Sequence, residues 1–258
     1  NMFPADVYVE RRKRLCQQVQ TGVILLPGHN ESPMNYPDNQ YPFRQDSSFL
    51  YFFGLDSPGL VGVIDLDEGK ECVFGNDLTV DDIVWTGPLP TVAERCHAAG
   101  VTETAPLDQL QTILSNAVDQ GRSVHFLPPC RADSILELQR LLGIGPDQIA
   151  AGASEALIRA AVAQRSVKSP EEIEQIEIAV DITRQMHTLA MKMTTDGLYE
   201  MDVAGAMEGL ALSRGGRLAF PTIFSIHGET LHNHYHGNKM SRGDIVVNDS
   251  GAESALHY

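Results

Sequence analysis

The feature that most constrains this chain is a long helical pattern that starts abruptly at residue 169. The stretch reads SPEEIEQIEIAVDITRQMHTLAMKM. Ser169 and Glu172 fit an S-x-x-E capping box, and Pro170 suits the first helical position. Apolar residues then recur at steps of three and four, which predicts one buried helix face. These residues are Ile173, Ile176, Val180, Ile182, Met186, Leu189 and Met193.

A second helix is expected soon after the first. Gly197 is predicted to end the first helix, and another helical pattern covers about 199–213 before a Gly-Gly pair. The segment therefore reads as the start of a new domain. We predict two domains, 1–160 and 161–258, and the second begins with these two helices.

The first 160 residues mix strand and helix patterns. Short apolar runs bounded by Gly, Pro or Asp predict strands at 23–27, 48–54, 60–66, 72–75 and 124–128. Helical patterns occupy 5–19, 91–99, 108–119 and 131–142. Such a mixture predicts an α/β domain. Neither GxGxxG nor GxxxxGK[ST] occurs, so no nucleotide-binding loop is expected.

The charge of the chain excludes some classes of partner. There are 34 Asp and Glu against 19 Lys and Arg, and the net charge is −15, which argues against nucleic acids and anionic membranes. No apolar stretch is long enough to span a bilayer. The one basic run, RRKR at 11–14, is expected to be a solvated helix face. The four cysteines form no CxxC pair, which indicates reduced thiols in a cytoplasmic protein.

The last 40 or so residues contain an aspartate, Asp249, at the end of a predicted strand. PTIFSI and GDIVVND predict two strands that flank the loop HGETLHNHYHGNKMSR. The period of two places Asp249 on one face with Ile245 and Val247. A carboxylate on an apolar face is costly unless it is paired or bound to a metal. The common alternative is that Asp249 caps the turn at 250–251.

The loop between these strands holds four of the nine histidines, His227, His232, His234 and His236. In an extended segment the last three would point to one side, as in a metal clamp. An ordinary polar loop is the alternative, because no neighbouring carboxylate is evident to orient the rings. A metal-storing or zinc-structural cluster over 227–236 is a third possibility. The pattern alone leaves these alternatives open.

Several stretches resemble one known family. YPDNQYPFRQDSSFLYFFGL is similar to the N-terminal domain signature of aminopeptidase P, the Xaa-Pro aminopeptidase family. RSVKSPEEIEQIEIAVDITRQMHTLAM resembles the entry into that family's catalytic domain, the pita-bread fold shared with prolidase and creatinase. FPTIFSI, LHNHYH and MSRGDIVVNDSGAE resemble its loop, histidine and first metal-binding strand. The resemblance implies a creatinase/aminopeptidase P-type α/β domain followed by an incomplete α+β pita-bread domain.

The resemblance assigns roles to individual positions. Asp249 matches the family's first metal-ligand aspartate. His232 lies 17 residues before it and matches the catalytic histidine, which steadies the scissile carbonyl; His234 is the alternative. Asp38 and Trp85 match substrate-site positions that reach the active site from a neighbouring subunit. The family resemblance therefore also implies a homo-oligomer, a dimer or a tetramer.

The family's activity depends on two divalent metal ions, usually manganese, with zinc or cobalt possible. The ions activate a hydroxide that attacks the carbonyl before proline, which releases the N-terminal residue of the peptide. The family site needs two aspartates, one histidine and two glutamates, and only Asp249 matches one of them. We therefore expect this chain alone to bind no metal tightly and to be inactive. A non-catalytic pita-bread module that binds peptides or proteins is the alternative.

Overall fold

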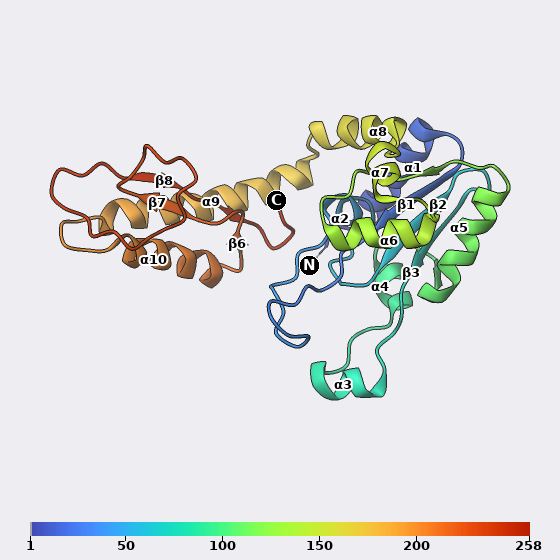
Figure 1. The fold of residues 1–258 in the computed structure, drawn as a ribbon, viewed down its shortest axis with the longest axis horizontal. Helices are drawn as coiled ribbons and strands as arrows, with labels where there is room; N and C mark the ends of the chain where they lie inside the picture. Colours follow the sequence, from blue (N-terminus) through green and yellow to red (C-terminus); the bar gives the residue numbers. More distant parts are fainter. Residues whose placement is uncertain (1) are drawn as a thin grey trace. The chain divides into compact units, whose positions relative to one another are not determined.

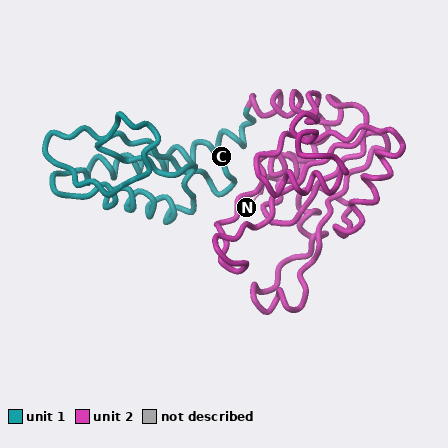
Figure 2. The backbone as a smooth tube through the Cα atoms, viewed as in Figure 1, with its two compact units in different colours: residues 1, 168–258 teal, residues 2–167 magenta. Residues whose placement is uncertain are grey.

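The computed structural model describes residues 2–258, which form two compact units. One unit comprises residues 2–167 and the other residues 168–258 (Figure 2). Across this described range, no helix combines the length and the apolar character needed to cross a membrane. Each unit has a hydrophobic core of its own.

The unit 2–167 is built on a mixed five-stranded sheet (Figure 1). The strands are β1 (Val23–Pro27), β2 (Val61–Asp65), β3 (Lys70–Phe74), β4 (Glu103–Ala105) and β5 (Val124–His125). Their order is β4-β3-β2-β1-β5; the central three are antiparallel, and each edge strand joins its neighbour in parallel. Four of the predicted strands therefore form, and the three-residue β4 was not predicted.

Helices cover both faces of this sheet. They are α1 (Ala5–Val19), α2 (Ser47–Phe53), α3 (Val80–Thr86), α4 (Val92–Ala98), η1 (Leu107–Gln109), α5 (Leu110–Asp119), α6 (Ala132–Leu142), α7 (Pro146–Ala151) and α8 (Glu155–Ser166). On one face, α5, α6 and α7 supply Leu114, Leu138 and Ile149 to a core that includes Val63 and Phe74. On the other, α2 lies against β1 and β2 and is packed on α1. Helix α3 projects from the rest of the unit (Figure 1).

The run at 48–54, predicted to be a strand, is instead helix α2. Asp46 caps its start by accepting hydrogen bonds of 2.9 and 2.8 Å from two backbone N–H groups of the first turn. Gly54 ends it in the left-handed conformation, with a φ of 68°. Four of its seven side chains are buried, so the run is apolar almost all round. A short run of that kind has no readable helical period, which is why the prediction was wrong.

The basic run at 11–14 is only in part the solvated face that was predicted, because its last two residues are exposed and its first two are buried. Arg11 is 3% exposed and Arg12 is 1% exposed. The Arg11 guanidinium lies 3.8 Å from the centre of the Tyr51 ring and donates to the Tyr51 carbonyl oxygen. Arg12 forms a two-pronged ion pair with Glu71, at 2.7 and 3.0 Å. Arg12 also donates to the main-chain oxygens of Phe52, Ala99 and Gly100.

The unit 168–258 contains two long helices and two small antiparallel sheets. Its elements are α9 (Pro170–Met193), α10 (Glu200–Ser213), β6 (Arg217–Leu218) paired with β9 (Ala252–Glu253), and β7 (Ile223–Ser225) paired with β8 (Val247–Asp249). Helices α9 and α10 pack against each other. Their shared core contains Ile182, Met186, Val203, Met207 and Phe224.

Helix α9 begins as predicted and ends earlier than predicted. The Ser169 hydroxyl accepts from the Glu172 N–H at 3.4 Å, and the Glu172 carboxylate accepts from the Ser169 N–H at 2.9 Å. The capping box is therefore confirmed. The helix stops at Met193 rather than at Gly197, whose N–H instead donates to the carbonyl oxygen of Met240.

The predicted apolar face of α9 is only partly buried. Ile182 and Met186 lie in the core, as expected. Ile173 and Val180 are 49% and 55% exposed, because the core of this unit covers mainly the second half of the helix.

Candidate active site

Asp249 ends strand β8, where it pairs with Ile223 of β7. It follows Ile245 and Val247 on one face of the strand, and these are 84% and 37% exposed. Val246, on the opposite face, packs against the core. The face that carries Asp249 is therefore apolar in sequence, as predicted, but open to solvent within residues 2–258.

The Asp249 carboxylate is exposed and makes no hydrogen bond or ion pair within the described residues. It does not cap the following turn. That turn is held by Asn248, which accepts from the Ser250 hydroxyl at 2.9 Å, and by His187 of α9, which donates to the Ser250 carbonyl oxygen at 2.9 Å. Asp249 is thus fixed by its strand and leaves its carboxylate available to a ligand.

The histidine loop, residues 227–237, follows β7 and is anchored by Ser225. The buried Ser225 hydroxyl accepts from the His227 N–H at 3.0 Å and from the Asn233 side-chain amide at 3.1 Å. The Asn233 side-chain oxygen accepts from the Tyr235 N–H at 3.0 Å. The sequence did not single out Ser225 or Asn233, because they lie eight positions apart and only the folded loop brings them into contact.

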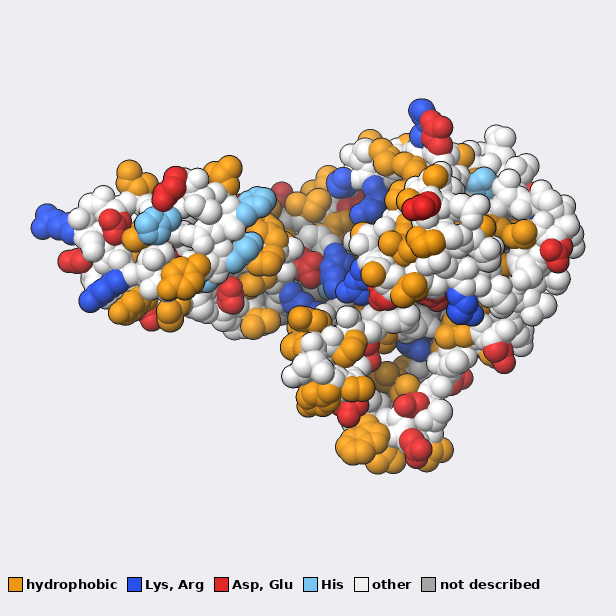
Figure 3. Space-filling view, viewed as in Figure 1, with side chains coloured by type: hydrophobic (Ala, Val, Ile, Leu, Met, Phe, Trp, Pro, Cys, Tyr) orange, Lys and Arg blue, Asp and Glu red, His pale blue; other side chains and the backbone are white. Residues whose placement is uncertain are grey.

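Two of the loop histidines converge on a single main-chain oxygen. Ring nitrogens of His234 and His236 lie 3.4 and 3.2 Å from the Thr222 carbonyl oxygen. Both histidines line, with Phe220, a hollow of about 540 Å³, and histidine side chains are visible on this unit's surface in Figure 3. His232 is exposed and does not join them. The three alternating histidines therefore do not form the one-sided clamp, which was one of the alternatives that the sequence left open.

The described residues do not assemble a metal site by themselves. Within 2–258, no group of three or more His, Cys, Asp or Glu is placed to hold a metal ion. The described residues therefore give no support to the alternative of a metal-binding cluster over 227–236. Asp249 offers one carboxylate, and a single carboxylate does not bind a divalent ion tightly. These residues alone do not fit a two-metal centre.

The other two predicted site residues lie in the unit 2–167. Asp38 is exposed in a turn within 33–40 that is closed by an antiparallel bridge. Trp85 lies on the projecting helix α3 and is 87% exposed. Asp249 and His232 thus share one unit, and Asp38 and Trp85 share the other.

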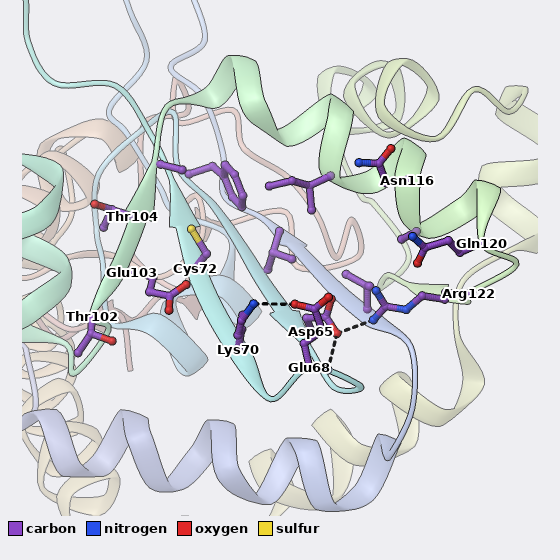
Figure 4. A pocket seen from close by; sticks show the side chains of 16 residues that line it. Asp65, Glu68, Lys70, Cys72, Thr102, Glu103, Thr104, Asn116, Gln120 and Arg122 are labelled. Carbon is purple, nitrogen blue, oxygen red and sulfur yellow. Dashed lines mark hydrogen bonds and ion pairs between the residues drawn. The ribbon is translucent and has the colours of Figure 1, made fainter.

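A second hollow, of about 640 Å³, lies on the sheet of the unit 2–167 (Figure 4). At one end Arg122 pairs with Asp65 and, at 2.7 Å, with Asp67, while Lys70 pairs with Glu68 at 2.8 Å. Burial opposes ionisation of Asp65, yet the Arg122 guanidinium holds the pKa of that carboxyl below its usual value. Both basic side chains are therefore neutralised by their acidic neighbours.

Cys72 also lines this second hollow, and its thiol is expected to react slowly at neutral pH. Burial, and then the nearby charge of Glu103, raise its pKa to about 11. Only the thiolate attacks, and its fraction at pH 8 is about 200-fold smaller than for an ordinary cysteine. Iodoacetamide labelling read by peptide mass spectrometry should modify the exposed Cys130 first, and Cys72 labelling should rise about tenfold per pH unit. Equal labelling of the two at pH 8 would contradict this.

Two family models match the chain. The aminopeptidase P N-terminal domain matches residues 8–125. Metallopeptidase family M24 matches residues 174–258. The two matches fall in the two compact units, respectively.

Curated relatives match nearly the whole chain at low identity. The Xaa-Pro aminopeptidase of Escherichia coli K12 is 28% identical over 267 residues, which cover 95% of this chain and 58% of that protein. The human Xaa-Pro dipeptidase is 26% identical over 269 residues, which cover 97% of this chain and 53% of that protein. The chain therefore spans only about half the length of these relatives.

Solved structures share the fold. Escherichia coli aminopeptidase P with the inhibitor Pro-Leu matches with a TM-score of 0.80 at 25% identity, over 99% of this chain and 60% of that one. Pseudomonas aeruginosa aminopeptidase PepP matches with a TM-score of 0.82 at 22% identity, over 98% and 59%. The fold predicted from sequence, an α/β domain followed by part of a pita-bread domain, is confirmed.

Proposed function

Because the chain belongs to the aminopeptidase P family, with that family's N-terminal domain followed by M24 metallopeptidase sequence, we propose that it forms part of an Xaa-Pro aminopeptidase. The reaction is hydrolysis that releases the N-terminal residue from peptides with proline in second position. Support comes from relatives that are Xaa-Pro aminopeptidases and dipeptidases. An X-Pro bond is a tertiary amide without an N–H, so a peptidase for it needs a dedicated site.

The observation that carries this proposal is the arrangement of Asp249 and the histidine loop. The loop leaves β7, and Asp249 ends the strand paired with β7. In the proposal Asp249 is a metal ligand and His232 steadies the scissile carbonyl. His232 is favoured over His234 because the His234 ring is already directed to the Thr222 carbonyl oxygen, whereas no hydrogen bond holds the His232 ring within the described residues.

Family M24 implies divalent metal ions, and the proposal takes manganese as the metal, with zinc or cobalt as the alternatives. The chain itself supplies Asp249 alone among the expected ligands. The remaining ligands would come from the part of the family's domain that this chain does not span. For this reason we propose that the 258-residue chain is inactive by itself.

Three further assignments complete the proposal. Asp38 and Trp85 contribute to substrate binding, and their exposure leaves them free to reach a neighbouring subunit of a homo-oligomer. The four free cysteines support a cytoplasmic location, where thiols stay reduced.

The decisive experiment compares this chain with a longer form that includes the rest of the M24 domain, called here the natural-length protein. Both are supplied with manganese and an X-Pro-Y peptide, and release of the first residue is measured by mass spectrometry. Hydrolysis by the longer protein alone is expected. Activity in neither would favour the non-catalytic peptide-binding module instead. Turnover by the 258-residue chain would show that the metal-ligand assignment is wrong.

A further inference from the structure

Glu200, the first residue of α10, is a fully buried carboxylate. A buried carboxylate is costly unless hydrogen bonds satisfy its oxygens. One oxygen accepts from the Ile226 N–H at 2.7 Å and the other from the Asn238 N–H at 3.2 Å. The Asn238 side-chain nitrogen donates to both oxygens, at 3.2 and 3.0 Å. Within the described residues, every hydrogen bond of this carboxylate is thus accepted from an N–H group.

The two main-chain N–H groups lie on either side of the histidine loop. Ile226 directly precedes residues 227–237, and Asn238 directly follows them. A single carboxylate therefore closes the loop at its base. The backbone reinforces the closure, because the Glu200 N–H donates to the Asn238 carbonyl oxygen and the Met201 N–H to the His236 carbonyl oxygen, both at 3.0 Å.

Helix α10 gives this closure a fixed base. Its side chains Val203 and Met207 are fully buried in the core of the unit. Tying both ends of a loop to one point removes much of the conformational freedom of its backbone. The backbone of the loop that carries His232 is thereby restricted at both ends.

We propose that Glu200 is a positioning residue for catalysis, whose carboxylate clamps both ends of the histidine loop and so sets the place of His232. This inference rests on the proposed function for the role of the histidine, and on hydrogen bonds within this chain for the clamp. Glu200 does not touch substrate in this proposal and acts only through the loop.

Glu200→Gln in the 258-residue chain tests the clamp. Glutamine keeps the shape but turns one acceptor into an N–H₂ that faces donors, so loop hydrogen bonds are lost. Hydrogen–deuterium exchange of amides 226–238 should accelerate about tenfold or more, with α9 unchanged. Glu177→Gln, an exposed site on α9, is the matched control. Unchanged loop exchange, or equal acceleration throughout 168–258, would overturn the clamp.

If Glu200→Gln does not fold, a less disruptive variant, Asn238→Ala, can test the clamp instead. Asn238→Ala removes only the two bonds made by that side chain and leaves the backbone N–H in place. Faster exchange is then expected in the histidine loop, by a smaller factor than for Glu200→Gln. Exchange identical to wild type would contradict the proposal.

Kinetics of the natural-length protein test the link to His232. Glu200→Gln should lower kcat about 10- to 100-fold with KM and metal content unchanged. In a protein that already carries His232→Ala, Glu200→Gln should lower kcat no further, because Glu200 acts only by positioning the imidazole that is now absent. Additive losses would refute the positioning role. If the wild type hydrolyses no X-Pro peptide, the proposed function fails, while the exchange experiment still decides the clamp.

Discussion

Replacing Arg12 with methionine should lower the free energy of unfolding of the unit 2–167 by about 3–5 kcal/mol. Methionine keeps a helix-compatible stem. It nevertheless deprives Glu71 of a two-pronged partner and removes the donor to three main-chain oxygens. A buried acceptor left without a donor costs about 1–3 kcal/mol. Urea denaturation followed by circular dichroism measures the difference.

Lys13→Met is the matched control for this prediction. Lys13 is the next residue of the same helix and the same basic run, but it is exposed. Its replacement should change the unfolding free energy by less than about 0.5 kcal/mol. If both variants lost stability equally, loss of charge on the helix would explain the effect. A loss below about 1 kcal/mol for Arg12→Met would refute the role of the buried network.

In the natural-length protein, His232→Ala is expected to lower kcat by about 10²–10³-fold. The imidazole in the proposed role stabilises negative charge that develops on the scissile carbonyl oxygen. That charge is absent in the ground state, so KM should change little. Steady-state hydrolysis of an X-Pro-Y peptide gives both constants, and elemental analysis of the purified variant shows whether metal is retained.

His234→Ala provides the comparison. The His234 ring lies 3.4 Å from the Thr222 carbonyl oxygen, so its loss should disturb the loop locally and lower kcat far less. A larger loss for His234→Ala than for His232→Ala would make His234 the catalytic histidine. Loss of metal from the His232 variant would contradict a role in carbonyl stabilisation.

Elements with strong local signals could be predicted from the sequence. Helix α9 carries its own start signal in Ser169, Pro170 and Glu172, and that capping box forms. Helix α1 has the bounds that its helical pattern predicted, and one of its faces is buried. Strand β1 has the bounds of its apolar run, and its first four residues are buried. The placement of Asp249 at a strand end followed from the period of two and is also seen.

Two features that were not predicted, the burial of Arg12 and the burial of Glu200, depend on contacts with residues far away in the sequence. From its local sequence Arg12 is expected to be a surface charge. In the fold it is buried, because Glu71 and carbonyl groups near residue 100 accept its hydrogen bonds. Glu200 reads as an ordinary acidic residue of a first helical turn, a position that favours exposed carboxylates. Its burial depends on Ile226 and Asn238, which a local pattern does not reveal. Helix α2 was missed for a different, local reason, because its short apolar run fits either a buried strand or a buried helix.

The two cores differ in mechanical character. In the unit 2–167, the core beneath α5, α6 and α7 consists mainly of Leu, Val, Ile and Phe. These side chains are branched or planar and adopt few rotamers. The core of the unit 168–258 instead includes Met186, Met207 and Met240. Methionine is unbranched and polarizable, so it fills space without fixing one shape. The shape of the histidine loop therefore depends more on the hydrogen bonds at its base than on the form of the core side chains beneath it.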